Sequence, residues 1–463
     1  MNKARLTNNW QKVKLEDIAD VKLSNVDKKS NLNERTVRLC NYTDVYNNIF
    51  ISEITAQHFM IASANDNEIE KFLLKKGQVA ITKDSETPDD IGVPAYIAQD
   101  FEDVVLGYHL AQITPFEDKL CGKYLNYLFH AKHLKQYFEY NSGGSGQRCS
   151  LALDSIKSIP LELPDFNTQC INAAVLYSLD EKIALNNRIN DNLEAMAKTI
   201  YDYWFVQNAD KKWGKKSLGE ISDILNGATP STADLSNYGG EVVWITPKDL
   251  SNQKNKFTYY GERNITQKGY QSCNTTIVPK DSILLSSRAP IGLLSISKCE
   301  LCTNQGFKSI VPKNKLMSSY LYYYIQHHIE KIQQLGAGTT FKEVSKNSLS
   351  DFSILCPTSD ALEKWQIFIN PIFNKQLALS KENKHLMQLR DWLLPMLMNG
   401  QVSVNYHLAS LIVPNILFRM STKFVINFWQ LEVRWQITRN LKKSKSFEWR
   451  KGNFWRRRET VRQ

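Results

Sequence analysis

Paired cysteines are missing from this 463-residue sequence: its eight cysteines are scattered, and only Cys299 and Cys302 stand at the spacing of a metal or redox pair. A zinc site needs a second such pair or histidines at ligand spacing, and the sequence offers neither. The pattern is typical of reduced thiols in a large intracellular protein. It excludes a small secreted domain held together by disulfides.

Long apolar runs are missing as well. No window holds about 18 uninterrupted apolar residues, and the first residues lack the apolar stretch of a secretory signal. We therefore expect a cytoplasmic protein with no membrane partner. Since 42% of the residues are hydrophobic and 11% aromatic, the chain has ample side chains for well-packed cores.

Most of the chain also has little net charge. The total is +11, but residues 405–463 hold 13 Lys and Arg against three Glu, a balance of +10 that leaves +1 for residues 1–404. If this nearly neutral body binds nucleic acid, it must do so through local basic loops rather than through a global field.

No catalytic motif is complete. Gly143-Gly-Ser-Gly146 is followed by Gln147 and Arg148, not by the Gly-Lys-Ser/Thr ending of a phosphate loop. Asn370-Pro-Ile-Phe373 lacks the second proline of an adenine-methylating motif, and no acidic pair precedes Glu-x-Lys as in metal-dependent DNA cleavage. We expect no catalytic residue, no metal ligand and no cofactor bound by this chain, so the motifs favour a binding protein.

What the sequence does contain is an internal duplication. Residues 183–205 predict a straight helix of about 22 residues, roughly 33 Å long, with a narrow apolar seam. The seam positions, at steps of 4, 3, 4 and 3, are Ile189, Leu193, Met196, Ile200 and Tyr203. A second stretch, residues 379–397, repeats the seam at an offset of 193 residues through Leu386, Leu389, Leu393 and Met396. Pro164 and Pro357 keep that offset, so the chain is predicted to hold two copies of one unit that pair through their helices.

Each copy has a body of mixed structure before its helix. Short β-branched runs such as 78–82 and 282–286 predict strands, and apolar periodicity predicts helices at 123–134 and 319–329. We therefore predict an α+β fold with a mixed β-sheet plus helices in each copy. The predicted division is an α+β unit at 1–160, a helical region at 161–210, a second α+β unit at 211–357, a second helical region at 358–403 and a tail at 404–463.

Two glycine-rich loops at the same place in both copies are candidates for contacts to phosphates and base edges. Glycine permits a close backbone approach, and the loops carry polar donors. The candidate residues are Ser145, Gln147 and Arg148 in the first copy and Thr339, Thr340 and Lys342 in the second. The alternative is an ordinary surface turn.

Further donors stand in turns that flank predicted strands. Arg288 has the geometry to read guanine bidentately, and Asn304 or Gln305 to read adenine. The remaining candidates of this kind are Lys248 and Lys308 in the second copy and Lys83, Tyr108 and His109 in the first. Each of them also fits an ordinary turn residue.

Several motifs, in this order and within a duplication, resemble the specificity (S) subunit of bacterial type I restriction-modification systems. They are Ser142-Gly-Gly-Ser-Gly-Gln147, Ile159-Pro-Leu-Glu-Leu-Pro164, Ile200-Tyr-Asp-Tyr-Trp-Phe-Val206, Ile245-Thr-Pro-Lys-Asp249, Arg288-Ala-Pro-Ile-Gly292 and Thr303-Asn-Gln-Gly-Phe-Lys-Ser309. The resemblance covers residues from about 10 to 403.

The resemblance implies two target recognition domains that each read half of a bipartite, asymmetric site in double-stranded DNA. It implies that the two helices form an antiparallel coiled coil relating the domains by pseudo-twofold symmetry. Two modification (M) subunits would dock on it and restriction (R) subunits would join through them, so S-adenosylmethionine, ATP and Mg would belong to these partners. The outward residues Asn187, Arg188, Asp191 and Lys198 are the expected docking face. A helix near 33 Å also matches one turn of B-DNA, about 34–36 Å, which predicts that its length sets the half-site spacing.

The tail departs from this pattern, because family members commonly end soon after the second helix. Three interpretations compete for residues 404–463: a foreign reading frame fused by rearrangement or frameshift, a basic arm on the DNA backbone, and an amphipathic segment at a membrane surface. For the whole chain, two other functions remain open. One is a coiled-coil adaptor without sequence readout, and the other is a stand-alone DNA methyltransferase.

Overall fold

This computed structural model describes residues 10–144, 148–253, 256–288, 290–338, 342–402 and 404. The chain divides into two compact units: unit 1 comprises Met1–Ala184 and Lys384–Gln463, and unit 2 comprises Leu185–Asn383. Both long helices are shared between the units, whereas the sequence assigned them to regions of their own. The tail beyond residue 404 lies outside the described residues, so its three interpretations stay predictions.

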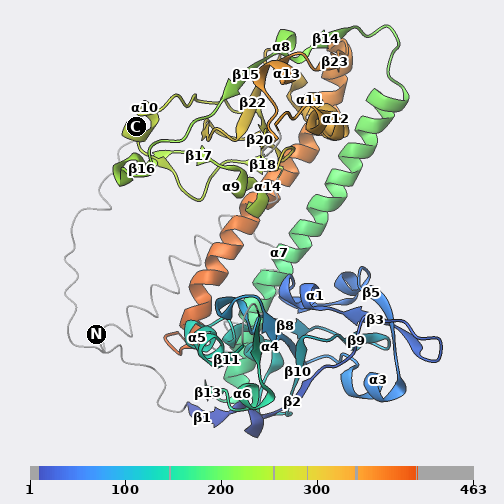
Figure 1. Ribbon diagram of the computed structural model, residues 1–463, viewed down its shortest axis with the longest axis vertical. Coiled ribbons are helices and arrows are strands. Elements are labelled where there is room, and N and C mark those ends of the chain that lie inside the picture. Colours follow the sequence, from blue (N-terminus) through green and yellow to red (C-terminus); the bar gives the residue numbers. More distant parts are fainter. Residues whose placement is uncertain are drawn as a thin grey trace, which may run out of the picture. The chain divides into compact units, whose positions relative to one another are not determined.

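Unit 1 is built around a five-stranded sheet in the order β2-β10-β6-β8-β4. Figure 1 labels β2, β10 and β8 of this sheet. Its strands are β2 (Ala19–Leu23), β4 (Phe50–Ile51), β6 (Val79–Thr82), β8 (Pro94–Ile97) and β10 (Leu110–Pro115). The pairing of β4 with β8 is parallel and the other pairings are antiparallel. All four residues of β6 are fully buried, which explains why a continuous run of small and β-branched residues forms this central strand.

Smaller strand groups and short helices surround this sheet. The strands are β1 (Gln11–Lys14) with β13 (Pro160–Leu163); β5 (Met60–Ala64) with β3 (Arg35–Cys40) and β9 (Val104–Leu106); and β11 (Ser142–Gly143) with β12 (Cys149–Leu151) and β7 (Asp84–Ser85). The helices are α1 (Tyr42–Tyr46), α2 (Glu53–Ala56), α3 (Asp66–Phe72), α4 (Gly122–Leu128), α5 (Lys132–Asn141) and α6 (Leu153–Lys157). The single helix predicted at 123–134 is therefore wrong in extent, because the chain turns between α4 and α5.

Unit 2 repeats this architecture with a sheet in the order β15-β22-β19-β20-β18. Its strands are β14 (Lys215–Ser217), β15 (Ser222–Asn226), β16 (Tyr238–Val242), β17 (Trp244–Ile245), β18 (Phe257–Thr258), β19 (Ile283–Ser286), β20 (Leu294–Ser297), β21 (Cys302–Thr303), β22 (Phe307–Pro312) and β23 (Ser353–Leu355). Its helices are α8 (Leu218–Ile221), α9 (Pro247–Gln253), α10 (Gln267–Gln271), α11 (Met317–His327), α12 (Ile329–Gln334) and α13 (Lys346–Ser350).

Several strand pairings recur in both units, although the pairings of β5 with β3 and of β11, β12 and β7 in unit 1 have no counterpart among the strands described in unit 2. The parallel pair β4–β8 matches β18–β20, the parallel pair β3–β9 matches β17–β21, and the antiparallel pair β1–β13 matches β14–β23. The predicted α+β fold with an internal repeat is therefore confirmed.

Two long helices follow the bodies: α7 (Phe166–Tyr201), continued by a π-helical turn at Asp202–Gln207, and α14 (Ser359–Met398). Asp165 starts α7 by accepting hydrogen bonds from the Thr168 N–H (3.0 Å) and hydroxyl (2.6 Å). After α14, Gly400 adopts a φ of +68°, and the Gln401 N–H closes the end by donating to the Met396 carbonyl (2.9 Å). With 36 residues, α7 is longer than the predicted 22-residue helix, because it begins directly after β13.

The two helices run antiparallel, since residue numbers fall along α14 as they rise along α7. In unit 1, Asp180 pairs with Arg390 and the Asn172 amide lies 3.4 Å from the Leu397 carbonyl. In unit 2, the Gln376 Nε2 donates to the Asn190 carbonyl (3.2 Å). In the part of the chain that the structure describes, none of the helices has both the length and the apolar character needed to cross a bilayer.

The predicted seam is partly wrong. In unit 1, Leu386, Leu389 and Leu393 do pack on α7, but against Leu179 and Ile183. In unit 2, Met196 and Tyr203 are 54% and 58% exposed, and the buried positions are instead Ala197, Tyr201 and Phe205. Leu193 and Ile200 pack at the margin of that core, whereas Ile189 and Met396 are half-buried.

The error has a physical reason, which is that the middle of the seam is polar. The buried Asn186 donates from Nδ2 to Asn383 Oδ1 (2.8 Å) and to Glu382 Oε2 (3.0 Å), and Asn383 Nδ2 donates to Asn187 Oδ1 (2.7 Å). A pattern search based on apolar residues passes over such positions. Because a shifted register would leave these amides without partners, the polar layer favours one register.

Candidate nucleic-acid interface

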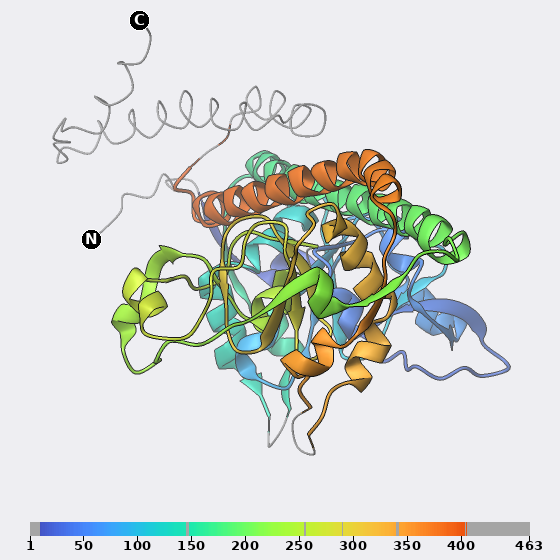
Figure 2. The same cartoon turned by 90° about the horizontal axis from the view of Figure 1, so that it is seen from above.

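In unit 1, several of the predicted contact residues meet where β6 ends and β10 begins. The Lys83 N–H donates to the His109 carbonyl (3.0 Å), and the Leu151 N–H donates to the Lys83 carbonyl (2.7 Å). These two backbone bonds, here called the loop frame, join the ends of β6, β10 and β12. Figure 2 shows the β11–β12 hairpin on the side of unit 1 that faces away from α7.

An acidic side chain organises the basic groups on this frame. Asp84 Oδ2 lies 2.8 Å from Lys83 Nζ and 2.6 Å from His109 Nδ1. The Lys83 ammonium also lies 5.1 Å from the centre of the Tyr108 ring. The structure therefore brings together Lys83, Tyr108 and His109, while Arg148 is exposed directly before β12.

Two properties distinguish this cluster from an ordinary turn. Burial alone would raise the pKa of Asp84, but hydrogen bonds from Lys83, Ser150 and His109 outweigh it and lower that pKa, so the carboxylate stays charged. His109 adopts a φ of +73°, a left-handed conformation that costs a non-glycine residue roughly 1–2 kcal/mol. Such strain persists where surrounding contacts impose it, as they do at binding sites.

Unit 2 contains the same loop frame with different residues. The Ser287 N–H donates to the Gly306 carbonyl (2.7 Å), and the Val344 N–H donates to the Ser287 carbonyl (3.0 Å). Ser287 thus takes the place of Lys83, and Arg288 takes the place of Asp84. The two units share the backbone scaffold, but the side chain at this position is negatively charged in unit 1 (Asp84) and positively charged in unit 2 (Arg288).

An open hollow of about 540 Å³ lies on this frame in unit 2. It is lined by Asn226, Gly227, Arg288, Gln305, Lys308, Glu343, Ser345 and Lys346. Lys308 Nζ lies 3.0 Å from Glu343 Oε1, and Arg288 Nη1 lies 4.0 Å from Glu343 Oε2. Three basic side chains against one acidic side chain make the hollow positively charged. Its walls also offer side-chain amides that can bind the edges of DNA bases.

Of the other predicted contacts, Gln305 lines the hollow, whereas Lys248 lies apart from it and Asn304 holds local structure. Lys248, on α9, pairs with Glu262 at 3.5 Å. Asn304 Oδ1 accepts the Gly306 N–H (2.9 Å) and so closes a turn, while the exposed Gln305 accepts a hydrogen bond from Thr229. Lys342 is exposed beside Glu343. Ser145, Gln147, Thr339 and Thr340 lie outside the described residues.

The sequence analysis missed the two acids. Asp84 directly follows the chosen Lys83, and Glu343 directly follows the chosen Lys342. The predicted contacts were donors to phosphates and base edges, whereas a carboxylate accepts hydrogen bonds and orients such donors. An acid next to a base in a predicted contact loop is a signal that would have found them. Among the described residues, no group of three or more His, Cys, Asp and Glu could hold a metal ion.

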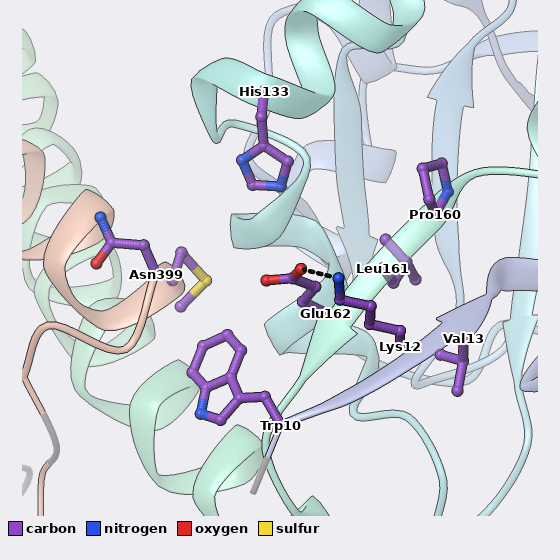
Figure 3. Close-up of a pocket in the computed structure, with 9 residues that line it drawn as sticks. Trp10, Lys12, Val13, His133, Pro160, Leu161, Glu162 and Asn399 are labelled. Atoms are coloured by element: carbon purple, nitrogen blue, oxygen red, sulfur yellow. Dashed lines mark ion pairs between the residues drawn. The ribbon is translucent and has the colours of Figure 1, made fainter. Parts of the chain in front are cut away.

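A separate pocket of about 410 Å³ in unit 1 lies at β1, β13, α5 and the end of α14 (Figure 3). Lys12 pairs with Glu162 at 3.4 Å on its wall, next to Trp10 and Asn399. None of the described candidate residues lines it. In unit 2, Trp213 stands before β14 as Trp10 stands before β1, and it packs on Phe205 with ring centres 5.8 Å apart. The pocket is therefore not part of the candidate interface.

Comparison with known proteins gives a separate match for each of the two copies. The model of the type I restriction modification DNA specificity domain matches residues 7–195 and again residues 210–386. The MjaIX specificity subunit of Methanocaldococcus jannaschii is 41% identical over 156 residues, 33% of this chain and 36% of that protein. This chain therefore aligns with only about a third of that relative.

A second relative aligns over nearly its whole length. The HindI specificity subunit of Haemophilus influenzae is 24% identical over 471 residues, which cover 85% of this chain and 99% of that protein. Among solved structures, the S subunit of a type I restriction-modification system from M. genitalium matches with a TM-score of 0.54 and 14% identity. That match covers 85% of this chain and 98% of the other, and it concerns the fold alone.

Proposed function

Because the chain belongs to the type I restriction-modification DNA specificity family, we propose that it gives a type I restriction-modification complex its DNA sequence specificity. The observation that carries this proposal is the shared loop frame. Unit 1 presents Lys83, Asp84 and His109 on it, and unit 2 presents Arg288, Lys308 and Glu343. Two copies of one scaffold with different polar side chains suit two different half-sites of an asymmetric bipartite sequence.

The partners and cofactors follow from this role. Two M subunits dock on the outward faces of the long helices, R subunits join through them, and S-adenosylmethionine, ATP and Mg are bound by those partners. This chain itself performs no catalysis. Arg188, Asp191 and Lys198 are exposed on α7 and suit docking, whereas Asn187 also reaches the polar layer between the helices. The protein is expected to act in the cytoplasm, where the DNA is.

Co-expression with a cognate M subunit, followed by genome-wide mapping of N6-methyladenine, tests this function. We expect one bipartite motif with a fixed spacer, and no methylation when either chain is expressed alone. Methylation by this chain alone would instead favour a methyltransferase. Methylation of the complex without a sequence motif would favour an adaptor.

Arg288→Ala is expected to relax the half-site read by unit 2. Arg288 lines the hollow, and its guanidinium can pair bidentately with guanine; such a contact is worth about 1–3 kcal/mol of discrimination, roughly 5- to 150-fold. Methylation mapping should show loss of preference at one position of one half-site, with the other half-site unchanged. Lys364→Ala, which removes an exposed base of unit 2 that pairs with Asp360 on α14 outside the hollow, is the control. Equal relaxation of both half-sites would contradict the assignment.

Four residues inserted in α7 near Ala195 are expected to change the spacer and leave both half-sites as they were. The insertion adds about 6 Å of helix, close to two base-pair steps of about 3.4 Å. Mapping the methylated motif of the variant measures the spacer directly, and substitutions at the same exposed site serve as the control. An unchanged spacer would show that the helix length does not set the half-site distance.

A further inference from the structure

We propose that Glu343 in unit 2 and Asp84 in unit 1 are specificity-determining positioning residues, which hold neighbouring basic side chains toward base edges and away from phosphates. This inference rests on the proposed function, because it concerns how the two units discriminate between DNA sequences. It assigns to two acids a role that a search for DNA-binding donors overlooks.

Glu343 is fixed by the backbone on which it stands. Its N–H donates to the Ala337 carbonyl (3.0 Å), and its own carbonyl accepts the Ala337 N–H (3.1 Å). The next residue, Val344, is tied to Ser287 through the loop frame. The carboxylate is therefore held in place at the rim of the hollow, with a side chain that is 40% exposed.

The two basic side chains that Glu343 contacts differ in their access to DNA. The Lys308 side chain is 9% exposed and lies in β22, with its ammonium 3.0 Å from the carboxylate. Arg288 is 38% exposed, and its guanidinium reaches the carboxylate only at 4.0 Å. Lys308 is thus committed to Glu343, whereas Arg288 is oriented by it and keeps donors for a base edge.

Unit 1 reaches the same arrangement by a different route. Its acid comes from β7, after the central strand, instead of from the glycine-rich loop. Asp84 nevertheless binds two basic groups at once, Lys83 at 2.8 Å and His109 at 2.6 Å, and all three side chains are at most 33% exposed. Both units place a carboxylate between two basic side chains, and they do so with different residues. This indicates that the arrangement itself serves the function.

The physical consequence is a penalty on unspecific contacts. An unrestrained Lys or Arg binds any phosphate, which adds affinity but no sequence information. A fixed carboxylate repels the phosphate charge and already satisfies the ammonium, so the remaining donors are directed at neutral base edges. The complex gives up some affinity for DNA in general and gains discrimination.

The test uses the whole complex with M subunits and compares Glu343→Gln with wild type. We expect binding to unrelated DNA to tighten about 5- to 10-fold. The slope of log K against log salt concentration should become steeper by about 0.9 for each basic side chain that is freed to contact a phosphate. Discrimination at the half-site read by unit 2 should fall about tenfold or more, while that of unit 1 is retained. Glu343→Asp should restore part of it.

Asp84→Asn is the mirror variant and should relax the half-site read by unit 1 alone. It keeps the inference testable if Glu343→Gln does not fold. The control is Asp360→Asn, which removes an exposed acid of unit 2 that pairs with Lys364 on α14; it should change neither discrimination nor the salt slope. Unchanged discrimination in both acid variants, or equal loss at both half-sites, would overturn the inference. A wild-type complex without a bipartite motif would instead refute the proposed function.

Discussion

Replacing Arg390 by methionine is expected to destabilise unit 1 by about 3–5 kcal/mol at neutral pH, because it leaves a buried carboxylate without its counter-charge. Arg390 Nη1 lies 2.8 Å from Asp180 Oδ1, and the Asp180 side chain is only 3% exposed. Tyr127, on α4, donates to the other oxygen at 2.6 Å. The triad thus ties the body of unit 1 to both long helices.

The loss should depend on pH with a definite sign. Burial raises the pKa of Asp180, while Arg390 and Tyr127 oppose that rise. A carboxyl whose pKa is higher in the folded than in the unfolded state binds protons on folding, so its contribution to stability is lost as the pH rises through the folded pKa. Without Arg390 the pKa rises further. The variant's deficit is therefore largest at neutral and higher pH, where the carboxyl is ionised, and shrinks as the pH falls and the carboxyl takes up a proton.

Urea denaturation at several pH values measures this effect, with Arg35→Met as the control. Arg35 is also in unit 1, but it is 67% exposed and stands 3.8 Å from an exposed Asp66; such a pair contributes about 0–1 kcal/mol. The difference between the two variants isolates the buried pair. A deficit that is the same at pH 5 and pH 8 would show that lost packing, not an unpaired charge, is responsible.

The long helices show how far sequence reasoning reaches. The offset of 193 residues, with short strands before each helix, was enough to predict two α+β copies and a helix pair, since both follow from periodicity. The contacts along the pair did not follow. Asn186 and Asn383 are buried between the helices while Met196 is exposed, because the three-dimensional fit of the bodies on the helices decides which face is covered.

The candidate interface likewise has residues that the sequence predicts and residues that it does not. The turns at Lys83 and Arg288 were predictable, because donors that follow a strand end are typical of contact sites, whereas Lys308, also predicted in a turn, lies in β22 with a side chain that is only 9% exposed. Their partners Asp84 and Glu343 were not, since the backbone bonds from Leu151 and Val344 that create the loop frame join residues far apart in the sequence. Local patterns identify what a loop carries, and only the fold shows what it faces.

Equivalent positions of the two copies also carry different packing. Trp365 and Asn172 stand at the same offset of 193 residues, each at the junction of a long helix with its body. Trp365 is fully buried among Tyr201, Phe205 and Tyr323, and its Nε1 donates to Ser319 Oγ at 2.9 Å. Asn172 is equally buried, but its amide reaches the Leu397 carbonyl only at 3.4 Å. Unit 2 therefore holds its junction by an aromatic core, which unit 1 lacks at this position.

Trp365→Ala is accordingly expected to cost unit 2 about 3–5 kcal/mol, because the cavity left by the indole removes both burial and ring contacts. Asn172→Ala is the matched control and should cost only about 1 kcal/mol, since the hydrogen bond it removes is long. Thermal unfolding gives the totals, and hydrogen exchange locates the loss, which should appear in α11 and the first half of α14. Equal costs for the two variants would mean that the junctions are held by something the copies share, and the aromatic core would lose its assigned role.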